Sequence, residues 1–551
     1  MTRLLSAYDR HDKTSRAARN LYAKVLEVYE KQEDKLRQGG GHAAAERQHK
    51  KGRLTARERL ALLLDKDEPF LELGLFAAWE MYAEWGDVPA AGVVCGVGRV
   101  HGRQFMVIAN DATVKAGAFF PMTTKKVIRC QRIALENRLP LLYLVDSAGV
   151  FLPLQDEVFP DEDDFGRVFR HNAVLSARGI PQMAAIMGSC VAGGAYLPVM
   201  CDTLLMTEGS GLFLAGPALV KAAIGQTADA ESLGGAAMHS QVSGTVDFRE
   251  PDDESCLQRL RSLAARIGPP PPPAFDRQKA REPLADADEL AGIVPLDGAR
   301  PYDVHEVLAR LVDASDFDEY RAEYGRTLVT GYARIGGWAV GIVANQRVNA
   351  KSPAHGVEFG SVIYAESAEK AARFVMDCNQ KHVPLVFLHD VSGFMVGQQA
   401  EQSGIIRAGA KLVNVVANSV VPKITVILGG SFGAGHYAMC GRAYDPRFIF
   451  AWPSARYAVM SGDAAARTLG DIRIQQLERK GHHVDEAEHK AIMDEVRARY
   501  AEALDPRYAA ARLWVDAIIR PQDTRAAITT AIEVAAHDPH VPEFKTGVLQ
   551  C

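Results

Sequence analysis

The chain contains two long stretches that match each other, each an expected helix followed by an apolar strand. Residues 126–149 (KVIRCQRIALENRLPLLYLVDSAG) align without gaps on residues 370–393 (KAARFVMDCNQKHVPLVFLHDVSG), with seven of 24 positions identical. A second pair, residues 181–196 and 422–437, follows in the same order. Unrelated α/β segments can share a helix, a proline and a strand, but two collinear matches make chance a poor explanation. The sequence therefore predicts two copies of one fold.

Short β-rich runs alternate with helical stretches from residue 90 to 250, and the same order returns after residue 300. This order predicts the α/β class. A chain of this length also exceeds one hydrophobic core, since cores stop growing at roughly 250–300 residues. A glycine followed by five prolines, residues 268–273, predicts a stiff extended spacer. The expected parts are an N-terminal helical arm at 1–65, a first domain at 66–268, a linker at 269–300 and a second domain at 301–551.

The composition argues against several classes of protein. With a net charge of −5 over 551 residues, no polybasic surface for nucleic acid or membrane is expected. The eight cysteines include no CxxC pair, which predicts free thiols in a reducing compartment rather than disulfides or a zinc ribbon. No apolar run reaches the length of a membrane span, and the start, with Asp9 and Asp12, does not look like a targeting signal. We therefore expect a soluble cytoplasmic protein, or one of the mitochondrial matrix if the source is eukaryotic.

Each copy of the repeat ends its second strand in a glycine-rich turn, at residues 188–195 and 429–435. Residues without bulk let backbone N–H groups approach a ligand oxygen, and two such groups around one oxygen form an oxyanion hole. The alternative is that the glycines only allow a helix to pack closely on a strand. Neither turn has the GxGxxG or GxxxxGK[ST] spacing, so nucleotide binding is disfavoured.

Two oxyanion holes suit a reaction in which two carbonyl-derived oxyanions form together, such as carboxyl transfer from biotin to a thioester. Such a reaction needs no protein nucleophile, and the sequence contains no GxSxG elbow, no HExxH motif and no cluster of metal ligands. We expect no bound metal. Four residues at expected strand ends could be taken for a catalytic triad: Asp146, Ser147, His389 and Asp390. For the two aspartates, capping of a turn or helix is the favoured role.

Several motifs are together specific enough to indicate a family. They are HKKGRLTARERLALLLD, NDATVKAGAFFPMTTKKVIR, MGSCVAGGAY and GGSFGAGHYAMCGRAYDPRFIFAWP, and the similarity extends over nearly the whole chain. In these motifs the sequence resembles the carboxyltransferase (β) subunits of biotin-dependent acyl-CoA carboxylases, and most of all the methylcrotonyl-CoA and geranyl-CoA branch. The resemblance implies an α/β fold of two tandem crotonase-like domains, of the ClpP/crotonase superfamily, related by internal duplication.

By the same resemblance, the backbone amides of two triplets would be catalytic, with Ala192, Gly193 and Gly194 holding the acyl-CoA enolate and Gly433, Ala434 and Gly435 holding the biotin oxygen. The residues expected on the acyl-CoA side are Lys115, Lys125, Lys126, Arg129, Ala148, Gly149, Val150, Phe151 and Tyr196. Those expected to bind biotin are Gly393, Phe394 and Tyr437. For the basic residues, phosphate contact and a solvated helix face are equally good explanations.

The resemblance also implies partners and a cofactor. Biotin would be carried by a biotin carboxylase/biotin carrier (α) subunit, since the chain has neither a biotinyl-lysine motif nor an ATP-grasp motif. A coenzyme A thioester would be the substrate. The chain would form a homo-oligomer, commonly a hexamer within a larger complex, in which the first domain of one subunit meets the second domain of another.

Two departures from the family pattern narrow the range of acyl groups expected in the substrate. Val150 and Phe151 put large side chains beside the expected acyl pocket, and Tyr437 replaces the Asp of propionyl- and acetyl-type enzymes. The leading expectation is 3-methylcrotonyl-CoA or a related branched enoyl-CoA. Alternatives are a geranyl, propionyl or medium-chain acyl-CoA, a biotin-dependent acyl-CoA decarboxylase, a hydratase or hydrolase using Asp156 or Glu157, and an inactive scaffolding paralogue.

Overall fold

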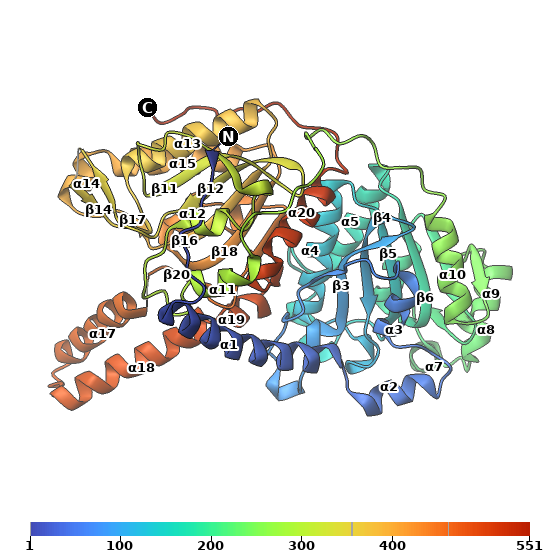
Figure 1. The fold of residues 1–551 in the computed structure, drawn as a ribbon. Helices are drawn as coiled ribbons and strands as arrows, with labels where there is room; N and C mark the ends of the chain where they lie inside the picture. Colours follow the sequence, from blue (N-terminus) through green and yellow to red (C-terminus); the bar gives the residue numbers. More distant parts are fainter. Residues whose placement is uncertain (1, 354–355, 461) are drawn as a thin grey trace. The chain divides into compact units, whose positions relative to one another are not determined.

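The computed structural model describes residues 2–353, 356–460 and 462–551. Over these residues the chain divides into two compact units, which we call the N-unit and the C-unit. The N-unit comprises Glu30–Pro272 with Ala510–Leu513, and the C-unit comprises Met1–Tyr29, Pro273–Ala509 and Trp514–Cys551. Figure 1 shows that each unit is built around a β-sheet with helices packed on it, which confirms the expected α/β class.

The N-unit sheet starts with antiparallel strands and continues as a parallel sheet (Figure 1). In spatial order its strands are β2 (Leu71–Leu73), β3 (Val93–Val100), β4 (Arg103–Asn110), β5 (Leu141–Ser147), β6 (Gln182–Val191), β7 (Thr203–Thr207) and β9 (Phe248–Glu250), with β8 (Gly211–Phe213) paired to the end of β6. Because β5 and β6 are covered on both faces, they are continuous apolar runs rather than alternating patterns.

Helices cover both faces of the N-unit sheet. They are α3 (Ala56–Leu63) and α10 (Asp253–Ala264) on one face and α4 (Pro121–Asn137) and α5 (Phe165–Ala177) on the other. Leu142 and Leu144 of β5 pack against α3 and α10. The intervening Tyr143 points to the opposite face, where Gln131 of α4 and Asn172 of α5 donate hydrogen bonds to its hydroxyl. This alternation is the two-residue period of a strand buried on both sides.

The C-unit sheet has the same sequence of antiparallel and then parallel strands. In spatial order its strands are β1 (Thr2–Arg3), β10 (Asp316–Glu319), β11 (Leu328–Ile335), β12 (Trp338–Asn345), β16 (Leu385–Val391), β18 (Lys423–Phe432), β19 (Phe448–Ala451) and β21 (Ala517–Ile518), with β20 (Arg456–Ala458) paired to the end of β18. Its core is formed by the sheet with α13 (Ala365–Gln380) and α15 (Ile405–Asn418), and α20 (Thr524–Ala535) also packs on β11 and β18.

The central strand pairs of the two sheets share one register. Leu141 of β5 pairs with Gln182 of β6, and Leu385 of β16 pairs with Lys423 of β18. These are the positions that the two repeat alignments match to each other. Both pairs also carry a register shift at the aspartate near the end of the shorter strand. The strand ends and the turns that follow them therefore have equivalent local geometry.

The two segments that flank the repeats, residues 1–65 and 269–300, divide between the units at other points than the boundaries expected from the sequence. Helix α1 (Lys13–Arg37) contributes residues to both units, so the segment 1–65 is divided between them. Residues 269–273, the five prolines, have no regular secondary structure, but the following residues belong to the C-unit and include the short helix α11 (Leu290–Ile293). Leu290 and Ile293 are buried, because they pack into the C-unit instead of forming an exposed spacer.

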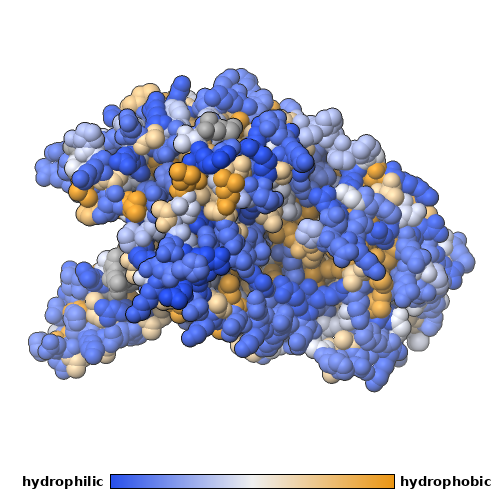
Figure 2. Space-filling model, in the orientation of Figure 1, coloured by the Kyte–Doolittle hydropathy of each residue, from blue (hydrophilic) through white to orange (hydrophobic). Residues whose placement is uncertain are grey.

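A helical hairpin follows β20 in the C-unit. It consists of α17 (Gly462–Arg479) and α18 (Glu486–Leu504), which pack mainly on each other. Figure 2 shows that the visible face of the molecule, this hairpin included, is mostly hydrophilic, with apolar side chains in scattered groups. Among the described residues, no helix combines the length and apolarity needed to cross a bilayer.

Candidate active site

The first glycine-rich turn lies where β6 leaves the N-unit sheet. Residues Ala192–Ala195 form the short 3-10 helix η5, and α6 (Tyr196–Val199) follows directly. The strand end of β5 is in contact with this turn: a Cβ atom added to Gly194 would lie 3.7 Å from the Cα of Gly149. A Cβ on Gly149 would in turn lie 2.9 Å from the carbonyl oxygen of Val191, and Gly149 has φ +88°. The contact therefore requires glycine at position 149.

The backbone amides at this turn differ in availability. Ala148 donates its N–H to the carbonyl of Ala116 at 3.0 Å, and Gly149 donates to the hydroxyl of Ser147 at 3.1 Å. These two amides are consequently used inside the protein. In contrast, the first amides of a helix have no acceptor within it, and Ala192 and Gly193 are the first two residues of η5.

Aromatic rings border the first turn. A Cβ on Gly193 would lie 3.5 Å from the ring of Phe165, at the start of α5. From Phe165 a row of rings runs through Phe169, at 5.2 Å between centroids, to Tyr196, a further 5.7 Å away. Tyr196 was expected from the sequence, but Phe165 and Phe169 were missed. Their spacing of four residues on one helix, facing the same side, is a signal that could have indicated them.

The four basic residues expected near coenzyme A fall into two groups. Lys115 and Lys125 are exposed, and Lys115 donates its ammonium to the carbonyl of Trp85. Lys126 and Arg129 are buried.

Lys126 has a structural role in the N-unit. It donates to the carbonyls of Ala90 and Val93 at 2.9 and 2.6 Å, and burial lowers the pKa of its ammonium. Lys126 therefore has no exposed atom to offer a phosphate. Its repeat equivalent, Lys370, is also buried and donates to the carbonyl of Arg321 at 3.2 Å, so packing accounts for the identity between the two positions.

Val150 and Phe151 follow Gly149 but take different roles. Val150 is half-buried and forms an isolated parallel β-bridge with Phe119. The ring of Phe151 stacks on Phe120 with 4.2 Å between centroids and meets the edge of Trp85 at 5.3 Å. Phe151 is thus part of a packed aromatic layer. Both residues are large at a position directly after the strand end.

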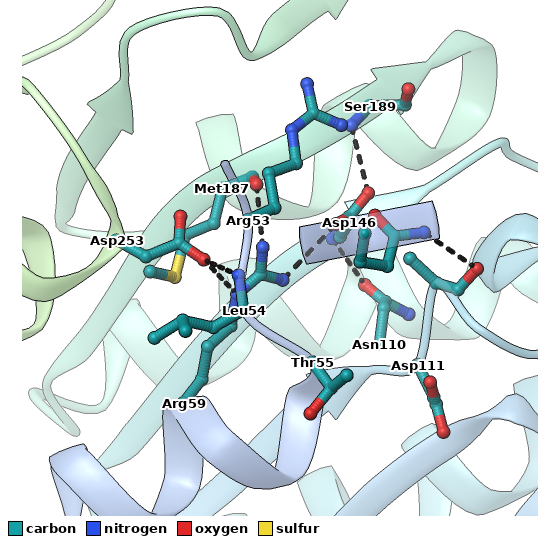
Figure 3. A network of polar contacts seen from close by, with 12 residues as sticks. Arg53, Leu54, Thr55, Arg59, Asn110, Asp111, Asp146, Met187, Ser189 and Asp253 are labelled. Atoms are coloured by element: carbon teal, nitrogen blue, oxygen red, sulfur yellow. Dashed lines mark hydrogen bonds and ion pairs between the residues drawn. The ribbon is translucent and has the colours of Figure 1, made fainter. Parts of the chain in front are cut away.

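A buried polar network supports the first turn from behind (Figure 3). Asp146 accepts hydrogen bonds from the N–H of Ser189 at 3.1 Å and from Arg59 at 3.3 Å. Arg59 also binds Asp253 at 2.7 Å and the carbonyl of Met187 at 2.8 Å. Burial raises the pKa of Asp146, and the adjacent guanidinium of Arg59 opposes that shift. The favoured capping role of Asp146 was therefore wrong, because the carboxylate links two strands instead of a turn or helix.

The same aspartate recurs in the C-unit with different partners. Asp390 accepts from the N–H of Gly430 at 2.9 Å and from the hydroxyl of Tyr302 at 3.0 Å, and it pairs with Arg347 at 3.3 Å. Its own N–H donates to the amide oxygen of Asn345 at 3.1 Å. Capping is again not the role of the aspartate.

Glycine is required where each strand passes its aspartate. A Cβ on Gly188 would lie 2.0 Å from a carboxylate oxygen of Asp146, and one on Gly429 would lie 2.7 Å from that of Asp390. Close packing therefore explains part of each glycine-rich motif. Packing also restricts Gly435, because a Cβ there would lie 2.6 Å from the side chain of Val391.

The second glycine-rich turn begins, like the first, with a residue of positive φ. It connects β18 to α16 (Gly433–Ala438), and Gly433 has φ +54° where Ala192 has φ +56°. A Cβ on Gly435 would lie 3.3 Å from the Cα of Gly393, the strand-end glycine of this unit. Because an α-helix leaves its first amides without an intrahelical acceptor, the N–H groups of Gly433, Ala434 and Gly435 are available.

The two aromatic residues expected to bind biotin are placed differently. Phe394 is half-buried and packs on α15, where a Cβ on Gly409 would lie 3.0 Å from its ring. Tyr437, directly after the second turn, is 47% exposed and lies 5.9 Å from the ring of Tyr444. A cavity of about 440 Å³ has Gly430, Phe432 and Arg456 in its lining.

The residues considered for other chemistries are not arranged for it. Ser147 donates its hydroxyl to the carbonyl of Gly117 at 2.7 Å, so it is not activated by a histidine. His389 is bonded to Ser431 and to the carbonyl of Met439. Asp156 and Glu157 are exposed at the end of the 3-10 helix η4 (Leu152–Glu157). The two turns with available amides are therefore the leading candidates for chemistry.

Comparison with known proteins defines the class. The family model of the carboxyl transferase domain matches residues 47–549. The chain therefore belongs to the carboxyl transferase family. Within that family it is of the β-subunit type found in biotin-dependent acyl-CoA carboxylases, as two relatives and one solved structure indicate.

The relatives are similar over nearly their whole lengths. The chain is 48% identical over 502 residues to the biotin-dependent 3-methylcrotonyl-coenzyme A carboxylase beta1 subunit of Mycobacterium tuberculosis, covering 91% of this chain and 92% of that protein. It is 45% identical over 523 residues to the mitochondrial methylcrotonoyl-CoA carboxylase beta chain of Arabidopsis thaliana, covering 94% and 86%. Its structure resembles the crystal structure of the P. aeruginosa geranyl-CoA carboxylase beta subunit with a TM-score of 0.87 and 34% identity, covering 100% and 99%.

Proposed function

We propose that this chain transfers a carboxyl group from carboxybiotin, carried by a partner subunit, to an acyl-CoA thioester, and that the acceptor is 3-methylcrotonyl-CoA or a related branched enoyl-CoA. The observation that carries the proposal is the pair of equivalent turns, each with available amides beside a strand-end glycine. The names of the two relatives and of the solved structure support the choice of acyl group.

In this proposal each turn stabilises one developing negative charge. Carboxybiotin supplies the carboxyl group. The amides of Ala192 and Gly193 donate to the thioester oxygen as the acceptor becomes an enolate. Those of Gly433, Ala434 and Gly435 donate to the ureido oxygen of biotin as the carboxyl group leaves. The carbon that receives the carboxyl group loses a proton, and the ureido nitrogen that has released the carboxyl group takes that proton up. Preorganised donors of this kind are each worth about 10²–10³ in rate, so two sites can supply a large part of the catalysis.

The side chains around the first turn support an unsaturated apolar acyl group. Phe165, Phe169 and Tyr196 form an aromatic border beside the amide donors. A flat enoyl chain can pack on such rings, whereas a short saturated chain would leave them in contact with water. Lys115 and Lys125, being exposed, are the better candidates for coenzyme A phosphates, with Arg129 as a buried contact.

We further infer that the two units arose by internal duplication and that the segment 1–65 acts as an arm. The shared strand register and the repeated Asp and Gly positions support the duplication. A biotin carboxylase/biotin carrier (α) subunit would bring biotin, and a hexamer would pair the N-unit of one copy with the C-unit of another. A cytoplasmic location, or the mitochondrial matrix in a eukaryote, is consistent with this role.

The test uses the reverse reaction, which needs no partner. The purified chain is mixed with free biotin and carboxylated 3-methylcrotonyl-CoA, and formation of 3-methylcrotonyl-CoA and carboxybiotin is followed by chromatography. A panel from acetyl to geranyl groups then gives kcat/KM for each. We expect the branched enoyl substrate to lead the panel. Another leading acyl group would overturn the substrate assignment, and absence of transfer with every member would overturn the function and favour a scaffolding role.

A further inference from the structure

Two buried histidines and a serine form a continuous hydrogen-bonded chain behind the second turn. His389 lies near the end of β16, Ser431 near the end of β18 and His436 within α16. The Nδ1 of His389 is 3.0 Å from the hydroxyl of Ser431, which is 2.8 Å from the Nδ1 of His436. The Nε2 of His389 bonds to the carbonyl oxygen of Met439, directly after α16. All four residues belong to the C-unit.

The direction of every hydrogen bond in this chain follows from the acceptors. A carbonyl oxygen only accepts, so the Nε2 of His389 carries a hydrogen and donates it to Met439. Because burial lowers the pKa of His389 to about 3, its ring is neutral and its Nδ1 accepts from the Ser431 hydroxyl. That hydroxyl has no second hydrogen, so the Nδ1 of His436 must donate to it. Each of the three side chains therefore has one tautomer or hydroxyl orientation with which all of these hydrogen bonds can form.

The hydrogen bonds among His389, Ser431, His436 and Met439 fix α16, the helix that carries the available amides. His436 and Met439 belong to or adjoin α16, whereas His389 and Ser431 belong to the central strands β16 and β18. The hydrogen bonds therefore tie α16 to two different strands at points one helical turn apart. A helix held at two points on a rigid sheet cannot rotate about its axis without breaking a buried hydrogen bond. This arrangement fixes the direction of the N–H groups of Gly433, Ala434 and Gly435.

The N-unit has no such chain. The repeat alignment places Val145, Cys190 and Ala195 at the positions of His389, Ser431 and His436. Of these, Cys190 contacts the carbonyl of Gly194 at 3.4 Å, a local and weak hydrogen bond. Val145 and Ala195 have only apolar side chains, and both are buried. The two units share the strand register, but the first turn continues as the 3-10 helix η5 and the second as the α-helix α16.

We propose that His389, Ser431 and His436 are positioning residues for the biotin-side turn, and that they hold its amides in the geometry that accepts the ureido oxygen. None of the three touches a substrate; they act through α16. The inference rests on the proposed function of the second turn and adds the residues that set its geometry. A loosely held hole would still bind biotin but would stabilise the developing charge poorly, because a misplacement of about 1 Å can cost about 10²-fold in rate.

The test compares three variants in the transfer of a carboxyl group to free biotin. His436→Ala removes the donor to Ser431 and leaves the turn unanchored. His436→Asn keeps a donor, because the side-chain amide nitrogen of Asn lies near the place of the imidazole Nδ1. The control is His489→Ala, which removes an exposed histidine from α18 of the same unit.

We expect His436→Ala to lower kcat/KM for biotin by about tenfold to a hundredfold, with the KM for the acyl-CoA unchanged. His436→Asn should recover most of the lost rate, and His489→Ala should have the wild-type kcat/KM for biotin and for the acyl-CoA. Equal losses in His436→Ala and His436→Asn, or a parallel change in the KM for the acyl-CoA, would overturn the positioning role.

Two further measurements separate this inference from its alternatives. If His436→Ala does not fold, as judged by thermal unfolding, Ser431→Cys takes its place, since it copies the N-unit residue and retains the volume of the side chain. It should lower kcat/KM for biotin in the same direction. If the wild type transfers carboxyl groups and Ser431→Cys has the same kcat/KM, only the positioning role is contradicted. If the wild type itself is inactive, the proposed function is contradicted.

Discussion

The two turns begin alike but differ in what surrounds them. In the N-unit, the positions equivalent to the histidine–serine chain of the C-unit hold Val145, Cys190 and Ala195, and a row of aromatic rings stands beside the turn. In the C-unit, a hydrogen-bonded chain of His389, Ser431 and His436 stands behind the turn, and Tyr437 is exposed in front of it. The comparison teaches that two turns of similar position and strand register can have very different polar surroundings.

The aspartates behind the turns extend the comparison. Asp146 depends on Arg59, which is fully buried and also binds Asp253. Asp390 has two independent partners, the hydroxyl of Tyr302 and the guanidinium of Arg347. Loss of a single arginine should therefore be more damaging in the N-unit.

The largest expected effect is on stability. Arg59→Met leaves Asp146 and Asp253 buried without their shared cation, and breaking a buried pair in this way costs about 3–5 kcal/mol. Arg347→Met should cost less, about 1–3 kcal/mol, because Tyr302 still donates to Asp390. Urea unfolding of both variants measures the difference, with the exposed Arg473→Met as the control. Equal losses at positions 59 and 347 would show that the two aspartates are held alike.

A second pair of variants tests the division of substrates between the turns. Tyr196 and Tyr437 are identical residues at equivalent positions, both about half exposed. Tyr196→Ala should raise the KM for the acyl-CoA about tenfold and leave that for biotin unchanged, since one lost aromatic contact is worth about 1.4 kcal/mol. Tyr437→Ala should do the reverse. Steady-state kinetics with both substrates varied would reveal an exchange or a mixture of these effects.

The pH dependence of the two turns should also differ. Burial lowers the pKa of His389 to about 3 and that of His436 to about 4, below the unfolded value of about 6.5. The unfolded chain therefore binds more protons between these values, so the stability from both histidines is present above pH 6.5 and is lost as the pH falls towards 4.

Hydrogen exchange at pH 7 and pH 5 measures this difference locally. Peptides covering residues 431–440 should lose protection at the lower pH more than those covering residues 188–196, which contain no histidine. His305, in the C-unit, has the opposite sign: its carboxylate partners raise the pKa to about 9, so its contribution is retained on acidification. Uniform loss of protection in both peptides would contradict the local assignment.

The smallest effect concerns the left-handed residue at each turn. Ala192 has a positive φ that costs an L-residue about 1 kcal/mol, whereas Gly433 pays no such cost. Ala192→Gly should therefore stabilise by up to about 1 kcal/mol, and Gly433→Ala should destabilise by about the same amount. Thermal unfolding of the two variants checks the signs. A destabilised Ala192→Gly would mean that the methyl group of Ala192 contributes packing that outweighs the strain.

The repeat pattern predicted a large part of the fold correctly. The α/β class and the strand–turn–helix elements follow from local signals: apolar runs of strand length, glycine-rich turns and helical periodicity. The matched positions Leu141 and Leu385 do lie at equivalent places in the two sheets. Such signals are readable because neighbouring residues in the chain determine them. The domain boundaries and the individual site residues remain predictions.

Lys126 shows where the sequence could mislead. Its place among basic residues near the start of an expected helix allowed either a phosphate contact or a solvated helix face, but its ammonium is buried against two carbonyls. Burial depends on the loop at Ala90 and Val93, which passes over the helix from an earlier part of the chain. No pattern around Lys126 reports that contact.

The sequence by itself therefore determined the class of fold, the two turns and the family, because these depend on local pattern and on motifs. Only the tertiary structure decided which groups stand behind each turn. Arg59, Asp146 and Asp253 come from three distant segments, and His389 and Ser431 come from two. The physical reason is that hydrogen bonds and burial depend on distances in space. Those distances are set by how strands pack, and residues that meet in this way can be far apart in the sequence, where no local pattern indicates the contact.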